Sequence, residues 1–413
     1  MSPDVIIVGA GLAGLCCARE LHRRGLRFQI LDAADGVGGR VRTDVVDGFR
    51  LDRGFQVFLT SYPEARRVLD YPALRLQPFL PGALVRFGGR FHTLADPWRR
   101  PLASIRSVLS PVGSLADKLR VARLRSRLLK RTIEDSFRDP ETTTLDALTA
   151  AGFSDGMIDR FFRPFLGGVF LDSDLRTSSR MFQFVFRMFA QGDACLPAEG
   201  MEAIPRQLAT FLPPGSVRLR TKVEKVGTGS VRLESGEDLS ARAIVVATDG
   251  PTAARLLGGD IPAAAVGVTC FSFAAPHPPI EAPVLVLNAE GRGPVNNLCV
   301  PTAVAPTYGP PGASLVSATV LGVPPDESRL RGEVLEQLAG WFGPAVRDWR
   351  HLRTYCIPHA LPRQEPPALA APERPVRREP GLYVCGDHRD NASINGAMVS
   401  GWRAAEAVAA DLS

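Results

Sequence analysis

The sequence predicts an α/β fold that opens with a Rossmann-type βαβ unit, and two observations carry this prediction. Residues 4–33 read in order as an apolar strand, a glycine-rich loop, a helix and a second strand. Near the other end, residues 383–387 form a further strand, and an Ala-rich helix follows to about residue 412. Helical and strand-like patterns both occur between these ends, which predicts a mixed α+β region inserted in the α/β domain.

The composition is that of a globular protein and excludes several other classes. The 413 residues are 45% hydrophobic and 22% charged, which excludes a disordered or collagen-like chain and allows two or three domains. The net charge is +6, and only four of the 49 basic residues are lysine. The six histidines and seven cysteines lack the spacing of metal ligands, so we expect reduced thiols and no metal site.

The loop between the first strand and the helix has the dinucleotide-binding pattern G-x-G-x-x-G. Gly9 permits the tight turn, Gly11 lets a pyrophosphate approach the backbone, and Gly14 lets the helix pack on the sheet. The helix N-terminus then offers free N–H groups and a positive dipole end to the phosphates. The candidate phosphate loop is Gly9, Ala10, Gly11, Leu12, Ala13 and Gly14.

An acidic residue closes the second strand. Asp32, followed by Ala33, can accept hydrogen bonds from the adenosine ribose hydroxyls. Its charge also repels a 2′-phosphate, which disfavours NADP. These residues predict dinucleotide binding but do not distinguish NAD from FAD.

The segment after the second strand resembles the flavin-containing amine oxidase superfamily. Residues Val37-Gly38-Gly39-Arg40-Val41-Arg42-Thr43 are similar to its GG-R-x-x-T segment, which lies beside the FAD pyrophosphate. The closing motif of the superfamily is matched by Gly386-Asp387 and, after it, Gly396-Ala397-Met398-Val399-Ser400-Gly401. The resemblance implies that FAD is the cofactor. Because residues 393–401 contain no cysteine, it also implies non-covalent binding.

The same resemblance implies roles for the other candidate cofactor residues. Asp387 is expected to meet the ribityl chain, and the helix that opens at Gly396 and Ala397 to lie at the pyrimidine edge of the flavin. Gly54 and Phe55 are expected beside the isoalloxazine ring. The resemblance also implies that the backbone of Val223 contacts the adenine.

The resemblance implies a Rossmann-like FAD-binding domain that is discontinuous, with an inserted mixed α+β substrate domain. We expect residues 1–62, 195–255 and 370–413 to form the FAD-binding domain. Residues 63–194 are expected to be the largely helical first part of the substrate domain, and residues 256–369 its second part, a sheet with an amphipathic helix at about Glu327–Phe342. Eight of the 21 phenylalanines lie between residues 161 and 189, which predicts either an apolar pocket wall or a helix-packing core.

The implied activity is that of an FAD-dependent oxidoreductase on the phytoene desaturase and protoporphyrinogen oxidase side of the superfamily. Many amine oxidases of this group use a lysine in the substrate-domain sheet, and the chain has no lysine after Lys225. We therefore expect dehydrogenation of a lipophilic or polycyclic substrate at a C–C or C–N bond, with the flavin reoxidised by oxygen or a quinone. The alternatives are an amine oxidase, a non-redox flavin-dependent isomerase and a non-catalytic flavin-binding protein. No residue is assigned as the catalytic acid or base.

A basic segment, residues 119–131, is the one candidate for a macromolecular contact. Its arginines alternate with leucines, which predicts either a solvated helix face or peripheral contact with an anionic membrane. No nucleic-acid module accompanies the positive charge, so we expect no nucleic-acid partner. The chain has no run of about 18 apolar residues and begins with a strand pattern at Val5, so we expect a cytoplasmic protein without a leader, and no oligomeric state is predicted.

Overall fold

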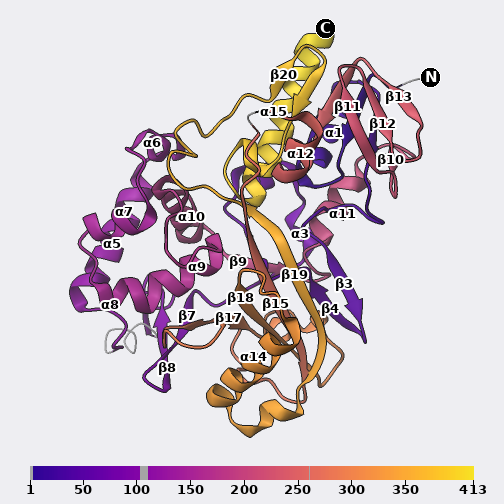
Figure 1. The fold of residues 1–413 in the computed structure, drawn as a ribbon. Coiled ribbons are helices and arrows are strands. Elements are labelled where there is room, and N and C mark those ends of the chain that lie inside the picture. Colours follow the sequence, from indigo (N-terminus) through magenta and orange to yellow (C-terminus); the bar gives the residue numbers. More distant parts are fainter. Residues whose placement is uncertain (1–2, 103–109, 260) are drawn as a thin grey trace.

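A mostly parallel six-stranded sheet lies near both chain ends (Figure 1). The structure, a computed structural model, describes residues 3–102, 110–259 and 261–413. The strand order is β10-β2-β1-β14-β21-β20; the first five strands run parallel and β20 is antiparallel. The strands are β1 (Val5–Val8), β2 (Phe28–Leu31), β10 (Val217–Arg218), β14 (Ala243–Val246), β20 (Arg377–Glu379) and β21 (Leu382–Val384). Distant stretches of the chain thus build one sheet, which confirms the α/β prediction.

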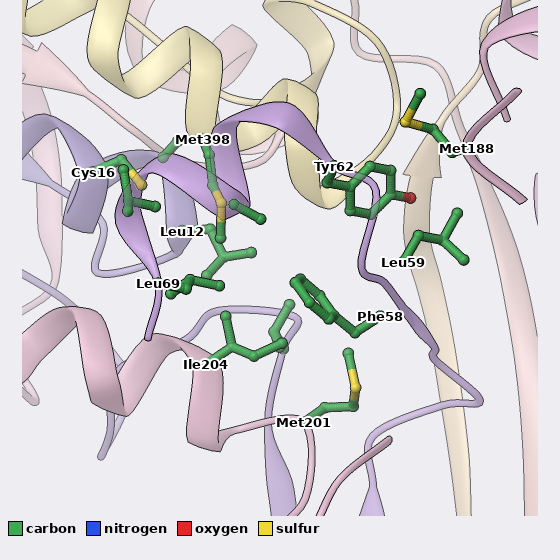
Figure 2. Close-up of a cluster of buried hydrophobic side chains, with 14 of the residues drawn as sticks. Leu12, Cys16, Phe58, Leu59, Tyr62, Leu69, Met188, Met201, Ile204 and Met398 are labelled. Carbon is green, nitrogen blue, oxygen red and sulfur yellow. The ribbon is translucent and has the colours of Figure 1, made fainter. Parts of the chain in front are cut away.

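The first and last helices pack against each other beside this sheet. They are α1 (Leu12–Arg23) and α15 (Ile394–Leu412). A Cβ at Gly401 would overlap the carbonyl oxygen of Ala13, so glycine permits this close approach. Figure 2 shows Leu12 of α1, Met398 of α15 and Ile204 of α11 (Ala203–Thr210) in one buried cluster. The two chain ends therefore share a core directly below the glycine-rich loop.

A second, seven-stranded sheet lies in the lower half of the view in Figure 1, away from the chain ends. Its order is β19-β15-β18-β17-β16-β7-β8. The strands are β7 (Gly82–Phe87), β8 (Arg90–Ala95), β15 (Ala265–Ala275), β16 (Leu285–Asn288), β17 (Val295–Cys299), β18 (Ser314–Leu321) and β19 (Arg350–Pro362). Helix α14 (Glu327–Phe342) covers one face, with Leu330, Val334 and Leu338 packed in the same cluster as Phe271 and Phe273. Its bounds agree with the amphipathic pattern of the sequence.

Residues 63–194 are less helical than the sequence predicts. They contain a helical group but also the β7–β8 hairpin, which joins the edge of the seven-stranded sheet. Gly88 and Gly89, with φ of 58° and 72°, form its tight turn. Because β7 pairs with β16, a strand from a distant segment, the local pattern alone was a weak signal for it. The helices of this group, which follow the hairpin, are α5 (Leu115–Lys130), α6 (Ile133–Arg138), α7 (Thr144–Ala150), α8 (Asp155–Met157), α9 (Arg163–Phe170) and α10 (Ser179–Gln191).

Smaller elements connect these parts. One hairpin (β3-β4) and two three-stranded sheets (β5-β9-β6 and β11-β12-β13) are formed by β3 (Thr43–Val46), β4 (Phe49–Asp52), β5 (Phe58–Leu59), β6 (Leu76–Pro78), β9 (Ala194–Pro197), β11 (Val223–Gly227), β12 (Ser230–Leu233) and β13 (Asp238–Ser240). The remaining α-helices are α2 (Pro63–Val68), α3 (Tyr71–Leu74), α12 (Gly250–Leu257) and α13 (Pro301–Val304). Among the described residues, no helix combines the length and the apolar character needed to cross a bilayer.

Candidate cofactor site

The glycine-rich loop joins β1 to α1 with the geometry expected of a phosphate loop. Gly9 has a φ of 112°, which favours glycine, and a Cβ at Gly14 would overlap the Gly9 carbonyl oxygen. Gly11 differs from both, because a Cβ there would meet no described atom within 4 Å. Gly11 is also the N-cap of α1 and provides no side-chain cap. The N-terminus of α1 therefore faces open space at Gly11, which suits an anion.

Asp32, at the end of β2, braces this loop. Its carboxylate accepts hydrogen bonds from the Ala10 amide at 2.6 Å and from the Ala34 amide at 2.7 Å. The Thr221 amide donates to the Asp32 carbonyl oxygen at 2.7 Å, which brings the start of β11 and buried Val223 to this edge of the sheet. Ala33 is exposed beside them. The residues predicted for the adenosine end thus lie on adjacent segments.

The segment that contains Gly38, Gly39 and Arg40 lies across from the glycine-rich loop. The Gly38 amide donates to the Ala10 carbonyl oxygen at 2.8 Å, and a Cβ at Gly39 would lie 3.4 Å from the Gly11 Cα. Arg40 then reaches the C-terminal motif, with its Nη2 2.7 Å from Asp387 Oδ2. The structure thus brings the two predicted cofactor motifs into direct contact.

Gly54 and Phe55 contact two strands of the seven-stranded sheet, β15 and β19. The Phe55 amide donates to Cys270 Sγ of β15 at 3.3 Å, and a Cβ at Gly54 would lie 3.0 Å from Ile357 Cδ1 of β19. Gln56, the next residue, donates from Nε2 to the Arg40 carbonyl oxygen at 2.9 Å. The segment predicted beside the isoalloxazine ring is therefore covered by the inserted sheet and tied to the Arg40 segment.

The C-terminal motif is held by hydrogen bonds to its own helix. The Gly386 amide donates to Ser400 Oγ at 2.9 Å, and Ser393 caps α15 by accepting from the Gly396 amide at 3.0 Å. A Cβ at Gly396 would overlap the Asn391 carbonyl oxygen. Ala397 follows in the first turn of α15. The turn and the helix start are thus a single rigid unit.

Two residues of this site were missed in the sequence. Gln364 is buried in the segment between β19 and β20. It donates to the Asp390 carbonyl oxygen and accepts from the Ala392 amide, both at 2.9 Å. His388 is 2% exposed, and neither of its ring nitrogens has a partner among the described residues. Burial lowers the pKa of His388 to about 4, so the ring is neutral at neutral pH. A histidine directly after the Gly-Asp turn was the available sequence signal for this residue.

The polar groups and the open space of this site fit FAD. Asp387 is 4% exposed and its Oδ1 has no partner among the described residues, so a buried acceptor is left for a ligand hydroxyl. The space in front of Gly11 and the uncapped start of α1 suit a pyrophosphate. Buried polar groups without partners are costly, so they indicate a ligand that satisfies them.

Most of the phenylalanine-rich segment that is buried forms core. Phe162, Phe182 and Phe184 are buried in the main hydrophobic cluster, and an edge-to-face ring contact connects Phe162 with Phe182. Of the two alternatives that the sequence left open, these three residues belong to the helix-packing core, whereas Phe170 also lines a cavity.

Comparison with known proteins agrees with this geometry. The family model for flavin-containing amine oxidoreductases matches residues 12–409. The chain is 25% identical over 325 residues to a coproporphyrinogen III oxidase of Propionibacterium freudenreichii subsp. freudenreichii, a match that covers 63% of this chain and 60% of that protein. It is 26% identical over 435 residues to a phytoene dehydrogenase of Streptomyces griseus, which covers 92% of this chain and 79% of that one.

A solved structure shows the same fold. An oxidoreductase from Methanosarcina mazei superposes with a TM-score of 0.70 at 18% identity, over 97% of this chain and 99% of that one. The predicted Rossmann-like domain with an inserted α+β domain is thereby confirmed. Since the family model matches nearly the whole chain, the protein belongs to the flavin-containing amine oxidoreductase family, and its cofactor is FAD.

Proposed function

We propose that the protein is an FAD-dependent oxidoreductase that dehydrogenates a lipophilic or polycyclic substrate at a C–C or C–N bond. The observation that carries this proposal is the cover over Gly54 and Phe55, where the Phe55 amide is bonded to Cys270 of the inserted sheet. A segment expected beside the flavin is thereby covered by β15 and by β19, whose Ile357 approaches Gly54. An enclosed, water-poor site suits hydride removal from an apolar substrate.

The chain contributes binding, orientation and exclusion of water. Bound FAD supplies the two-electron acceptor chemistry. The N-terminus of α1 and Arg40 are expected to hold the pyrophosphate, and Asp387 the ribityl hydroxyls. The N-terminus of α15, near Gly396, would stabilise negative charge on the bound cofactor through its positive dipole end. The substrate loses a hydride and a proton, and oxygen or a quinone finally takes up two electrons and two protons.

The branch of the family is inferred from one absence and from the relatives. The chain has no lysine after Lys225, which disfavours the lysine-dependent amine oxidation known in this superfamily. The relatives include an oxidase named for a porphyrinogen and a dehydrogenase named for phytoene. Both names support a large, apolar ring or polyene rather than an alkylamine as the substrate.

Anaerobic flavin reduction tests this proposal. The FAD-loaded protein is mixed with coproporphyrinogen III, phytoene or putrescine, and bleaching of the visible flavin absorption is followed. We expect bleaching with a porphyrinogen or a polyene and none with putrescine. Rapid bleaching by the amine alone would contradict the proposal. The Gly11→Ala variant, which is expected to fold without retaining FAD, is the control for reaction outside the site.

We also infer that α5 contacts an anionic membrane surface. Leu115 and Leu119 are 62% and 60% exposed on this helix, and Arg123 is exposed one turn further on. Arg125 is directed inward, because it stacks 4.6 Å from the Trp98 ring centroid and donates to the Ala190 carbonyl oxygen.

Vesicle flotation tests the membrane contact. Binding to vesicles that contain phosphatidylglycerol should weaken when Arg123 and Arg127 are replaced by Gln, or when Leu119 is replaced by Ser. Arg329→Gln, on the exposed face of α14, is the matched control. Equal flotation of wild type and all variants, or no flotation of wild type, would contradict the membrane contact.

A further inference from the structure

A small cavity of about 20 Å³ lies between β4, the segment that follows it and two strands of the seven-stranded sheet, β15 and β18. Asp52, the last residue of β4, and Tyr308, the last residue of a 3₁₀ turn, both line this cavity. Ser272 of β15 and Ser317 of β18 line it from the sheet. A cavity of this size holds about one water molecule when it offers roughly two to four polar partners.

The two serines place the cavity on the sheet face that is turned toward the cofactor segment. Ser272 and Ser317 are direct partners across β15 and β18, so their side chains share one face. Side chains alternate along a strand, so Cys270 shares this face too, while the opposite face carries the α14 cluster. Cys270 Sγ accepts from the Phe55 amide at 3.3 Å, and Phe55 and Gln56 also line the cavity. The cavity therefore adjoins the segment expected beside the isoalloxazine ring.

Asp52 is held in a fixed orientation by donors to both of its carboxylate oxygens. Its Oδ1 accepts from Thr43 Oγ1 at 2.5 Å and from the Met201 amide at 2.9 Å, and its Oδ2 accepts from the Tyr308 hydroxyl at 2.8 Å. A carboxylate oxygen has two lone pairs, so Oδ2 can accept from one further donor. Tyr308 is 1% exposed, whereas Asp52 is only half-buried. A water molecule in the cavity can thus reach the carboxylate.

The charged side chains closest to Asp52 are neutralised by other partners. Arg50 also lines the cavity, but its Nη2 donates to Glu199 Oε2 at 2.5 Å. Glu202, next to Met201, lies 3.3 Å from Arg42 Nε. The partners of Asp52 are instead two hydroxyl groups and a backbone amide, all of them neutral.

This environment makes Asp52 a carboxyl group that can take up a proton. Burial and, to a smaller extent, the charge of Glu202 raise the pKa of Asp52 to about 6, although its three hydrogen bonds lower it. Burial also raises the pKa of the Tyr308 hydroxyl and of the nearby Cys299 thiol, so both stay neutral. A carboxyl group that titrates close to neutral pH can accept a proton and return it.

We propose that one water molecule in this cavity connects Asp52 with the cofactor face, and that Asp52 stores the proton that the substrate releases. This assignment rests on the proposed function, because it specifies the proton acceptor of that same site. The substrate gives a hydride to the cofactor and a proton to the water as its second C–H or N–H bond breaks. The water passes one of its own protons to Asp52, where an O–H bond forms. When oxygen or a quinone takes two electrons and two protons, one proton comes from the cofactor and one from Asp52, which is ionised again.

The pH dependence of the flavin midpoint potential tests this link without a substrate. Negative charge on the reduced cofactor favours the protonated form of a nearby carboxyl group, so reduction should draw one additional proton to Asp52. We expect the potential of the FAD-loaded wild type, measured by photoreduction with reference dyes, to fall more steeply with pH in an interval that begins at about pH 6. Asp52→Asn should abolish this interval. Tyr308→Phe should move it to higher pH, because the ionised carboxylate loses a donor.

Tyr355→Phe is the matched control. The Tyr355 hydroxyl donates to Asp44 Oδ2 at 2.8 Å, a tyrosine–carboxylate pair of the same kind whose two residues do not line the cavity. This variant should reproduce the wild-type curve. Identical curves for wild type and Asp52→Asn would overturn the link between Asp52 and the cofactor.

Anaerobic bleaching of the flavin by coproporphyrinogen III tests the proton transfer itself. In wild type the rate should rise as Asp52 ionises, through about pH 6, whereas Asp52→Asn should bleach about a hundredfold more slowly and without this rise. Bleaching of Asp52→Asn at the wild-type rate would overturn the proton store and leave the dehydrogenation in place. If neither coproporphyrinogen III nor phytoene bleaches wild type, the proposed dehydrogenation fails, and the potential curves still decide whether Asp52 is coupled to the cofactor.

Discussion

Arg40 and Asp387 form an ion pair between the first and the last cofactor motif, with Arg40 Nη2 2.7 Å from Asp387 Oδ2. The second carboxylate oxygen, Oδ1, is buried and has no partner among the described residues. The pair thus orients one acceptor for a ligand while it neutralises charge inside the protein. Two segments from opposite ends of the chain are thereby positioned before the cofactor arrives.

Disrupting this pair should weaken FAD binding. Asp387→Asn removes the charge but keeps the shape, and we expect the FAD dissociation constant to rise about tenfold, equivalent to about 1.4 kcal/mol. Arg40→Gln should have a similar effect. The double variant should lose less than the sum of the two, because each single change already breaks the same pair. Flavin fluorescence titration of the apoprotein measures all three, and strictly additive losses would show that the two residues act independently.

Gly11 and Gly14 should respond oppositely to the same substitution. A Cβ at Gly11 meets no described atom within 4 Å, so Gly11→Ala should unfold at the wild-type urea concentration when FAD is absent. The added methyl group occupies the space expected for the pyrophosphate, so FAD affinity should fall by about a hundredfold. Gly14→Ala should destabilise the apoprotein by about 2 kcal/mol or more, because its Cβ overlaps the Gly9 carbonyl oxygen. If the Gly11 variant kept wild-type FAD affinity, the phosphate loop would be wrongly assigned.

Asp52 should make the free energy of unfolding depend on pH. Burial raises the pKa of Asp52 to about 6, against hydrogen bonds from Thr43 Oγ1 at 2.5 Å and the Tyr308 hydroxyl at 2.8 Å. The unfolded carboxyl ionises first as the pH rises from about 4, so the folded state loses stability, by up to about 3 kcal/mol, until the folded carboxyl has also ionised above pH 6.

Replacement of Asp52 by Asn tests whether the Asp52 carboxyl lowers the free energy of unfolding as the pH rises. The amide remains neutral and can still accept from Thr43 and donate toward Tyr308. Relative to wild type, the free energy of unfolding of Asp52→Asn should therefore increase as the pH rises from 4 to 7. Urea denaturation at both pH values measures this difference. Asp52→Ala, which leaves the donors of Thr43 and Tyr308 without their acceptor, should be destabilising at either pH.

The sequence predicted the parts of the fold whose signals are local. The strand, loop and helix around Gly9–Gly14 and the amphipathic helix α14 are set by neighbouring residues, so pattern alone located them. The β7–β8 hairpin was missed because its strands are stabilised by β16, far along the chain. His388 and Gln364 were missed for a similar reason, since burial and long-range hydrogen bonds make them distinctive. Motif resemblance predicts the cofactor residues, whereas the hydrogen bonds of Gln364 and the buried position of His388 required the three-dimensional arrangement.

His388 should make the apoprotein acid-sensitive. Its pKa is lowered by burial from the usual 6.5 to about 4, so the folded state takes up this proton later than the unfolded state as the pH falls. The contribution of His388 is fully present above pH 6.5 and is lost progressively toward pH 4, by up to about 3 kcal/mol.

His388→Gln removes the titrating group, so the free energy of unfolding should fall less between pH 7 and pH 4.5 than it does in wild type. Asp52 and Asp390 titrate in the same pH range and change the free energy of unfolding in the opposite direction. Both residues are present in wild type and in the variant, so their contributions cancel in the comparison. Exposed His277→Gln is the matched control. Identical slopes for wild type and His388→Gln would mean that the buried ring finds a partner for its second proton.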